Sequence, residues 1–162
     1  MADLRATTTT HAAGEVVYDL ISDVTRMGEW SPENQGGEWL DGATGARIGA
    51  RFRSRNKRRA SWTTTAVVTE AHRAAAFGFA VGKRAPDRPD TRWRFTIADL
   101  PGGGCAVTET CEIARPPGWL GRRLLTLATG VAWADRPGDL VHGMEETLRR
   151  LAAAAEAIAG PR

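Results

Sequence analysis

The chain has 162 residues, of which 42% are hydrophobic and 25% charged, and these values fit one globular domain spanning residues 1–162. No apolar run approaches the roughly 20 residues of a membrane-spanning helix, and the first ten residues contain no apolar signal core, so we expect a cytoplasmic protein. The net charge of +3 is too small to indicate a nucleic-acid partner by itself.

The first predicted elements are a strand and a helical segment. Residues 4–11 are rich in threonine, a β-branched residue that favours strands. In the next segment, 15–32, apolar residues mark one face of an amphipathic helix: Val16, Val17, Leu20, Ile21 and Val24. The segment continues through Asp23 and Gly28 to Trp30, and Pro32 prevents further helix.

The middle of the chain is predicted to form consecutive strands joined by short turns, which favours an antiparallel sheet. The strands are expected within 36–42, 47–59, 61–70, 75–82, 91–98 and 105–113, with a loop at 83–90 and a hairpin turn at 101–104. Segment 47–59 alternates clearly. One face holds Ile48, Ala50, Phe52, Ser54 and Asn56, and the other holds arginines.

Two helices are predicted to follow the sheet. The apolar run 119–133 is interrupted by glycines and predicts a short irregular helix, which we interpret as a lid or as packing rather than a membrane or dimer contact. Residues 137–159 predict a long helix with Pro137 in its first turn. Its expected buried stripe is Leu140, Met144, Leu148, Leu151, Ala155 and Ile158.

The two cysteines lie in one predicted strand, 105–113. At roughly 3.3 Å per residue, Cys105 and Cys111 would be about 20 Å apart, whereas a disulfide needs less than about 7 Å. We therefore expect buried free thiols.

Together these elements predict an α+β helix-grip fold. A curved antiparallel sheet of about six or seven strands surrounds the long C-terminal helix, with two short N-terminal helices and an internal cavity. This order, with Asp23, Trp30 and Pro32 ahead of the glycine-rich turn, resembles the SRPBCC superfamily of START, pollen-allergen and polyketide cyclase/dehydrase-like proteins. Trp62 and the segments GARFRSRN (49–56), TRWRF (91–95) and VTET (107–110) resemble an actinobacterial branch of it.

The resemblance implies a central cavity for a hydrophobic small molecule such as a lipid, isoprenoid or polyketide. Large apolar side chains are the expected ligand contacts, with Trp30 and Trp119 flanking the mouth. The full set is Trp30, Phe52, Trp62, Phe77, Phe79, Trp93, Phe95, Trp119 and Met144. The alternative for the tryptophans, of about equal weight, is that they simply fill the core.

Two polar residues on otherwise apolar strand faces are the catalytic candidates. Glu109 shares a face with Val107 and Cys111, and burial would raise its pKa so that it could act as a general acid or base. Asn56 could hold a carbonyl or enolate oxygen. The favoured alternative for Glu109 is structural, either an ion pair with an arginine of the neighbouring strand or a face inverted by a bulge.

Residues 47–59 contain seven Arg or Lys and no acid. A solvated outer face is the leading interpretation. The second is a docking surface for an anionic partner such as an acidic carrier protein, formed by Arg51, Arg53, Arg55 and Lys57. Specific binding of nucleic acid is the least favoured, because only Trp62 is near for stacking.

The sequence thus favours a binder of hydrophobic small molecules. The alternatives are a polyketide cyclase, aromatase or dehydratase that works by acid/base catalysis, and a regulatory protein-interaction module; a homodimer is possible. The histidines (His11, His72 and His142) are far apart and lack ligand spacing, so no metal is expected, and no cofactor either.

Overall fold

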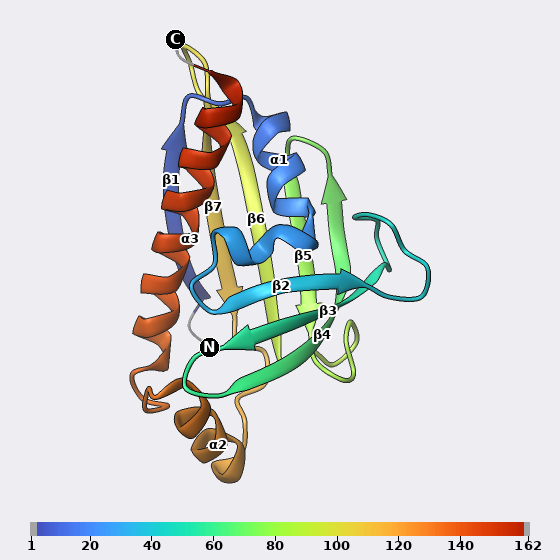
Figure 1. Ribbon diagram of the computed structural model, residues 1–162, viewed down its shortest axis with the longest axis vertical. Coiled ribbons are helices and arrows are strands. Elements are labelled where there is room, and N and C mark those ends of the chain that lie inside the picture. Colours follow the sequence, from blue (N-terminus) through green and yellow to red (C-terminus); the bar gives the residue numbers. More distant parts are fainter. Residues whose placement is uncertain (1–2, 161–162) are drawn as a thin grey trace.

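The computed structural model of the protein describes residues 3–160 and contains the predicted helix-grip architecture (Figure 1). In chain order the elements are β1 (Asp3–Thr10), α1 (Gly14–Ser22), the 3-10 helix η1 (Val24–Glu29), β2 (Asn34–Trp39), β3 (Arg51–Lys57), β4 (Ser61–His72), β5 (Ala76–Val81), β6 (Thr91–Asp99), β7 (Cys105–Glu112), α2 (Trp119–Thr129) and α3 (Arg136–Ala159).

The strands form one antiparallel sheet in the order β1-β7-β6-β5-β4-β3-β2. The register shifts between Asn34 and Gly37 where β2 pairs with β3, and between Val68 and Glu70 where β4 pairs with β5. Such bulges bend strands and increase their twist. In Figure 1, β2, β3 and β4 accordingly cross the direction of the other strands, and the sheet curves around its inner face.

Three helices cover different parts of that inner face. The long helix α3 packs on β1 and β7, α1 packs on β5 and β6, and η1 packs on β2. The buried stripe of α3 contains Met144, Leu148, Leu151 and Ala155 as predicted. The prediction is wrong for Ile158, which is 59% exposed because the last turn of α3 extends past the end of β1 (Figure 1).

The N-terminal helical segment divides at Asp23. Its carboxylate accepts a hydrogen bond from the Thr25 backbone N–H at 3.1 Å, which caps the 3-10 helix. Within η1, Gly28 lies directly on β2, where a Cβ atom would be 2.8 Å from the carbonyl carbon of Gln35. This close approach holds the segment against the sheet edge and directs Trp30 inward.

Both cysteines are buried and free, as predicted. Burial raises the pKa of the Cys111 thiol to about 12, with a smaller contribution from the neighbouring Glu109 carboxyl. None of the helices within residues 3–160 is long and apolar enough to cross a membrane.

Candidate functional site

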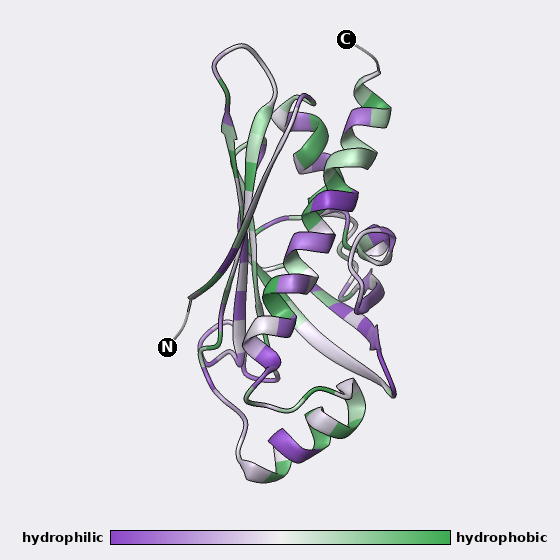
Figure 2. Ribbon diagram, turned by 90° about the vertical axis from the view of Figure 1, so that its left-hand side faces the viewer, coloured by the Kyte–Doolittle hydropathy of each residue, from purple (hydrophilic) through white to green (hydrophobic). Residues whose placement is uncertain are grey.

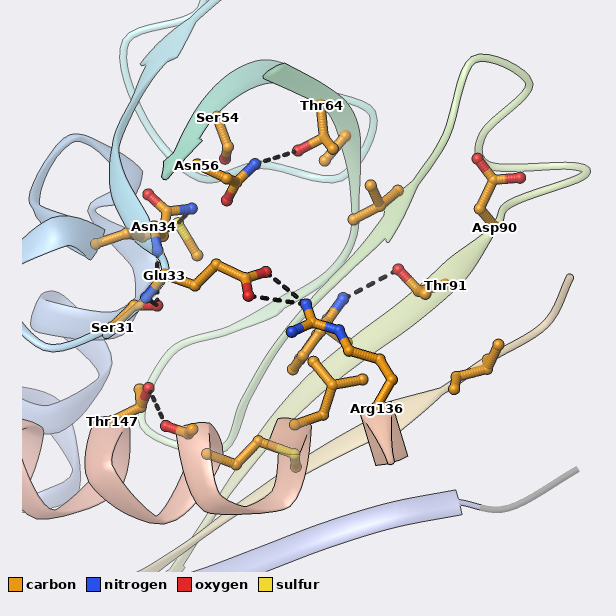
Figure 3. A pocket seen from close by; sticks show the side chains of 18 of the residues that line it. Ser31, Glu33, Asn34, Ser54, Asn56, Thr64, Asp90, Thr91, Arg136 and Thr147 are labelled. Atoms are coloured by element: carbon orange, nitrogen blue, oxygen red, sulfur yellow. Dashed lines mark hydrogen bonds and ion pairs between the residues drawn. The ribbon is translucent and has the colours of Figure 1, made fainter. Parts of the chain in front are cut away.

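A cavity of about 530 Å³ lies between the inner face of the sheet, η1 and the N-terminal half of α3. This volume is in the range of small-molecule sites. Most of the accessible surface of its wall is apolar, and polar and charged side chains from several elements also line it (Figure 3). The alternation of β3, β4 and β6 produces that wall, because every second side chain points inward.

Most of the predicted ligand contacts line this cavity. They are Trp30, Phe52, Trp62, Phe79, Trp93, Phe95 and Met144. The Phe52 ring contacts Trp39 and Phe79 edge-on, with ring centroids 5.6 Å and 5.3 Å away. These contacts fix the orientation of the aromatic wall.

Two expected wall residues lie elsewhere. Phe77 is fully buried but belongs to the core near α1, beside Phe79, and is not among the residues that line the cavity. Trp119, the first residue of α2, is 72% exposed and is not among the residues that line the cavity, so the structure does not give it the expected ligand contact. The residues around it that do line the cavity are Pro116, Pro117, Gly118, Leu125 and Trp133.

Trp30, expected at the mouth, is instead nearly completely buried in the core cluster, while still lining the cavity. The guanidinium of Arg26 lies 5.5 Å from the centroid of its ring. Trp30 therefore fills part of the core and also forms part of the inner wall of the cavity.

Glu109 lies on the inner face of β7, between Ala6 of β1 and Phe95 of β6, and lines the cavity. The residue is only 4% exposed, and its Oε2 has no hydrogen-bond partner among the described residues. The expected ion pair with a neighbouring arginine is not formed, because Arg92 and Arg94 pair on the outer face with Glu112 and Glu70.

Burial raises the pKa of Glu109 from its ordinary value to about 8. At neutral pH the side chain is therefore mainly a neutral carboxylic acid, which can donate one hydrogen bond as well as accept. The protonated Glu109 carboxyl is thus a proton donor in the wall of the cavity. By contrast, the pKa of Glu70 on the outer face is lowered, because Glu70 accepts a hydrogen bond from Arg94.

Asn56 also lines the cavity, from β3. Its Nδ2 donates a hydrogen bond to Thr64 Oγ1 on β4 at 3.3 Å, and Ser54 lies two residues away on the same strand face (Figure 3). These amide and hydroxyl groups form a small polar patch that can donate to and accept from a ligand oxygen.

An ionic network crosses the cavity wall beside η1 and α3. Arg136 Nη2 donates to both carboxylate oxygens of Glu33, at 2.7 Å and 2.8 Å (Figure 3). Its Nη1 donates to Asp139 at 2.5 Å. Asp139 also accepts from Arg58 at 3.0 Å. Burial alone would lower the pKa of Arg136, but the hydrogen bonds and charges of Glu33 and Asp139 outweigh it and raise that pKa.

The network was not predicted from the sequence. Glu33 and Arg136 are separated by 103 positions, and neither belongs to a recognisable motif. The network joins the segment before β2, the β3–β4 hairpin and the first turn of α3, so it fixes the relative position of three parts of the wall. Among residues 3–160, no group of three or more His, Cys, Asp or Glu side chains could hold a metal ion.

Fold and cavity together define a helix-grip protein with an internal cavity. The chain belongs to the family described as polyketide cyclase/dehydrase and lipid transport, whose model matches residues 1–156. No curated protein matches the chain.

Solved structures share the fold. Protein CV1439 from Chromobacterium violaceum has a TM-score of 0.67 at 19% identity, with 96% of this chain and 99% of that chain covered. The polyketide-cyclase-like protein Cgl2372 from Corynebacterium glutamicum has a TM-score of 0.59 at 24% identity, covering 93% and 88%. The di-domain ARO/CYC BexL from the BE-7585A biosynthetic pathway has a TM-score of 0.66 at 15% identity, covering 99% of this chain and 50% of BexL.

The buried carboxyl makes stability depend on pH. The folded state keeps the Glu109 proton up to about pH 8, whereas the unfolded chain loses it near its ordinary pKa of 4.5. This contribution to stability is therefore complete below pH 4.5 and is lost as the pH rises toward 8, by up to about 1.4 kcal/mol per pH unit. We expect Glu109→Gln to remove this decline in urea unfolding between pH 5 and 8.

Glu112→Gln is the matched control for that experiment, because Glu112 lies on the same strand but pairs with Arg92 on the outer face. It should leave the decline in place. Equal slopes for wild type and Glu109→Gln would contradict a protonated Glu109.

The ionic network should contribute strongly to folding. Replacing Arg136 by Met leaves the Glu33 carboxylate without its ion-pair partner and Asp139 with Arg58 alone, and we expect a loss of about 3 kcal/mol in the free energy of unfolding. Arg53→Met breaks the exposed pair with Glu38 and should cost less than about 1 kcal/mol. Denaturant unfolding at pH 7 measures both, and similar losses would show that the network has no special role.

Proposed function

We propose that the protein binds a hydrophobic small molecule carrying oxygen substituents, such as a polyketide, isoprenoid or lipid, in the internal cavity. The observation that carries this proposal is the cavity itself, which has about 530 Å³ of space and a wall whose accessible surface is mainly aromatic and aliphatic. Apolar burial supplies most of the affinity for such a ligand, and a few placed polar groups orient it.

The polar groups favour a ligand with at least one carbonyl or hydroxyl oxygen. The neutral Glu109 carboxyl can donate a hydrogen bond to such an oxygen, and its Oε2 lacks a partner among the described residues. An unpaired buried polar atom costs free energy, so a ligand oxygen at this position would gain from satisfying it. The patch of Asn56, Ser54 and Thr64 offers a second polar contact in the cavity.

Filling the cavity tests this proposal. Ser54 is buried, faces the cavity from β3, and can be replaced by Phe to occupy the ligand space. Arg55→Phe introduces the same side chain one residue along the strand, on the exposed outer face. We expect the neutral dye N-phenyl-1-naphthylamine to bind the wild type and Arg55→Phe, and to bind Ser54→Phe at least tenfold more weakly.

Fluorescence titration measures this difference, and circular dichroism checks that both variants are folded. Native mass spectrometry of freshly purified protein then looks for a retained molecule. If the wild type binds no dye, or if Ser54→Phe binds it as tightly as Arg55→Phe does, the cavity is not a ligand site.

Catalysis in the same cavity is the second candidate, and the buried carboxyl of Glu109 favours it. A carboxylic acid with a pKa of about 8 is suited to give a proton to a ketone oxygen or a departing hydroxyl at neutral pH. Asn56 could stabilise the enolate oxygen that forms when a water molecule accepts the proton from the neighbouring carbon, and the hydroxyl that Glu109 protonates then departs as water. The ARO/CYC description of BexL is consistent with this chemistry in a protein of the same fold.

Turnover distinguishes an enzyme from a binder. With a β-hydroxy aryl ketone as probe, an enzyme should release water and form the conjugated ketone at a rate that falls as the pH rises through about 8. We expect Glu109→Gln to lower this rate by at least 100-fold while dye binding persists. An unchanged rate in Glu109→Gln would remove the assigned catalytic role.

The basic hairpin supports the docking hypothesis only in part. Arg51 and Arg53 pair with Asp41 and Glu38, whereas Arg55 and Lys57 are exposed near the tip. Docking of an acidic carrier protein and formation of a homodimer stay predictions.

A further inference from the structure

The helix α2 exposes an apolar surface that the cavity does not explain. Four of its large side chains are more than half exposed: Trp119 at 72%, Leu120 at 56%, Leu124 at 58% and Leu127 at 71%. At 100° per residue they fall within about 140° of the helix circumference. On the opposite side, Leu125 lines the cavity and Thr129 is buried.

This surface projects from the molecule. Figures 1 and 2 both show α2 at one end, beyond the first turn of α3, and the helix makes only sparse contacts with the other helices and strands. A backbone hydrogen bond from Ala60 N to Ala128 O joins its C-terminal turn to the tip of the β3–β4 hairpin. The apolar side chains therefore lie on a protrusion rather than in a groove.

The surroundings of the apolar surface are basic. The sequence from Ile113 to Ala134 contains Arg115, Arg122 and Arg123 and no acidic residue. Gly130 has a left-handed backbone, φ +80°, and any Cβ there would be 2.5 Å from the Arg59 side chain, so the hairpin arginine lies against the end of α2. None of the ion pairs among residues 3–160 involves Arg59, Arg122 or Arg123.

We propose that α2 is a membrane-docking helix that inserts Trp119, Leu120, Leu124 and Leu127 into the surface of a bilayer containing anionic lipids. At the same 100° per residue, Arg123 lies among these apolar side chains and Arg122 lies just outside them. A helix face that combines exposed apolar side chains with basic ones is typical of interfacial helices. Each basic residue near an anionic membrane surface contributes attraction that salt screens. A protruding helix suits a deformable bilayer better than it suits a rigid protein partner, which would need a matching groove.

Docking in this way would bring the cavity to the membrane. Pro117, Gly118 and Leu125 line the cavity and belong to α2 or to the residues just before it. A hydrophobic ligand could then pass between bilayer and cavity without crossing water. This consequence rests on the proposed ligand binding, whereas the docking itself does not.

Vesicle binding tests the docking. We expect the full-length protein to co-sediment with vesicles of 30% phosphatidylglycerol and 70% phosphatidylcholine, and to bind pure phosphatidylcholine at least tenfold more weakly. Raising NaCl from 50 to 500 mM should weaken binding to the anionic vesicles. Brominated lipids should quench wild-type tryptophan fluorescence more strongly than that of Trp119→Phe.

Substitutions in α2 test whether this helix makes the contact with the membrane. The double substitution Leu120→Asp and Leu124→Asp should lower vesicle binding at least tenfold, and Arg123→Glu at least fivefold. Ile158→Asp and Arg5→Glu are the controls, because both residues are exposed away from α2, and they should bind as the wild type does. Ser54→Phe should also keep vesicle binding, which separates docking from occupancy of the cavity.

Three outcomes would overturn the proposal. One is a wild type that does not bind anionic vesicles, even if α2 binds a protein. Another is an equal loss of binding in the α2 variants and the controls. The third is a homodimer in sedimentation that the Leu120 and Leu124 substitutions convert to monomer, since α2 would then be buried between two copies.

Discussion

A single long helix cannot cover a curved sheet of seven strands, and the cavity follows from this constraint. The apolar stripe of α3 is satisfied by β1 and β7, while α1 covers β5 and β6 and η1 covers β2. The inward faces of β3 and β4 and the near ends of β5 and β6 have no helix directly on them, and their side chains line the cavity. Space remains because α1 and η1, the helices nearest the bent strands β2, β3 and β4, are short.

Protein interiors are normally close-packed, so a space of this size needs a wall that resists inward packing of its side chains. Aromatic edge contacts around Phe52 and the ionic network around Arg136 meet this need in different ways. The rings resist compression by packing, and the network fixes three segments by directional hydrogen bonds. Glu109 fits this interior because its proton stays on, so the fold avoids a buried negative charge.

Sequence periodicity predicted the features that arise from neighbouring positions. The alternation around Phe52 and Asn56 and the spacing from Met144 to Ala155 each correspond to one buried face, and the inward position of Glu109 followed from the apolar residues on either side of it. Periodicity shows which side chains of a strand point inward, but not which of them a helix covers and which line the cavity. Phe77 and Phe79 share a face, yet only Phe79 lines the cavity.

Contacts between distant positions were not predictable from a single chain. The pairing of Glu33 with Arg136, and of Arg51 with Asp41, depends on how the sheet curves, which local composition does not specify. The direction of α2 was missed for a similar reason. Its apolar residues suggested burial, and only the position of the neighbouring elements shows that Trp119 faces outward.

The irregular pairing of β2 has a consequence for how copies of the protein meet. An open sheet ends in strands whose outer backbone groups could pair with another chain and begin aggregation. At one edge, α3 lies along β1; at the other, β2 is short, its register shifts between Asn34 and Gly37, and η1 lies against it. The same bulge that helps to bend the sheet therefore also protects this edge from unwanted strand pairing.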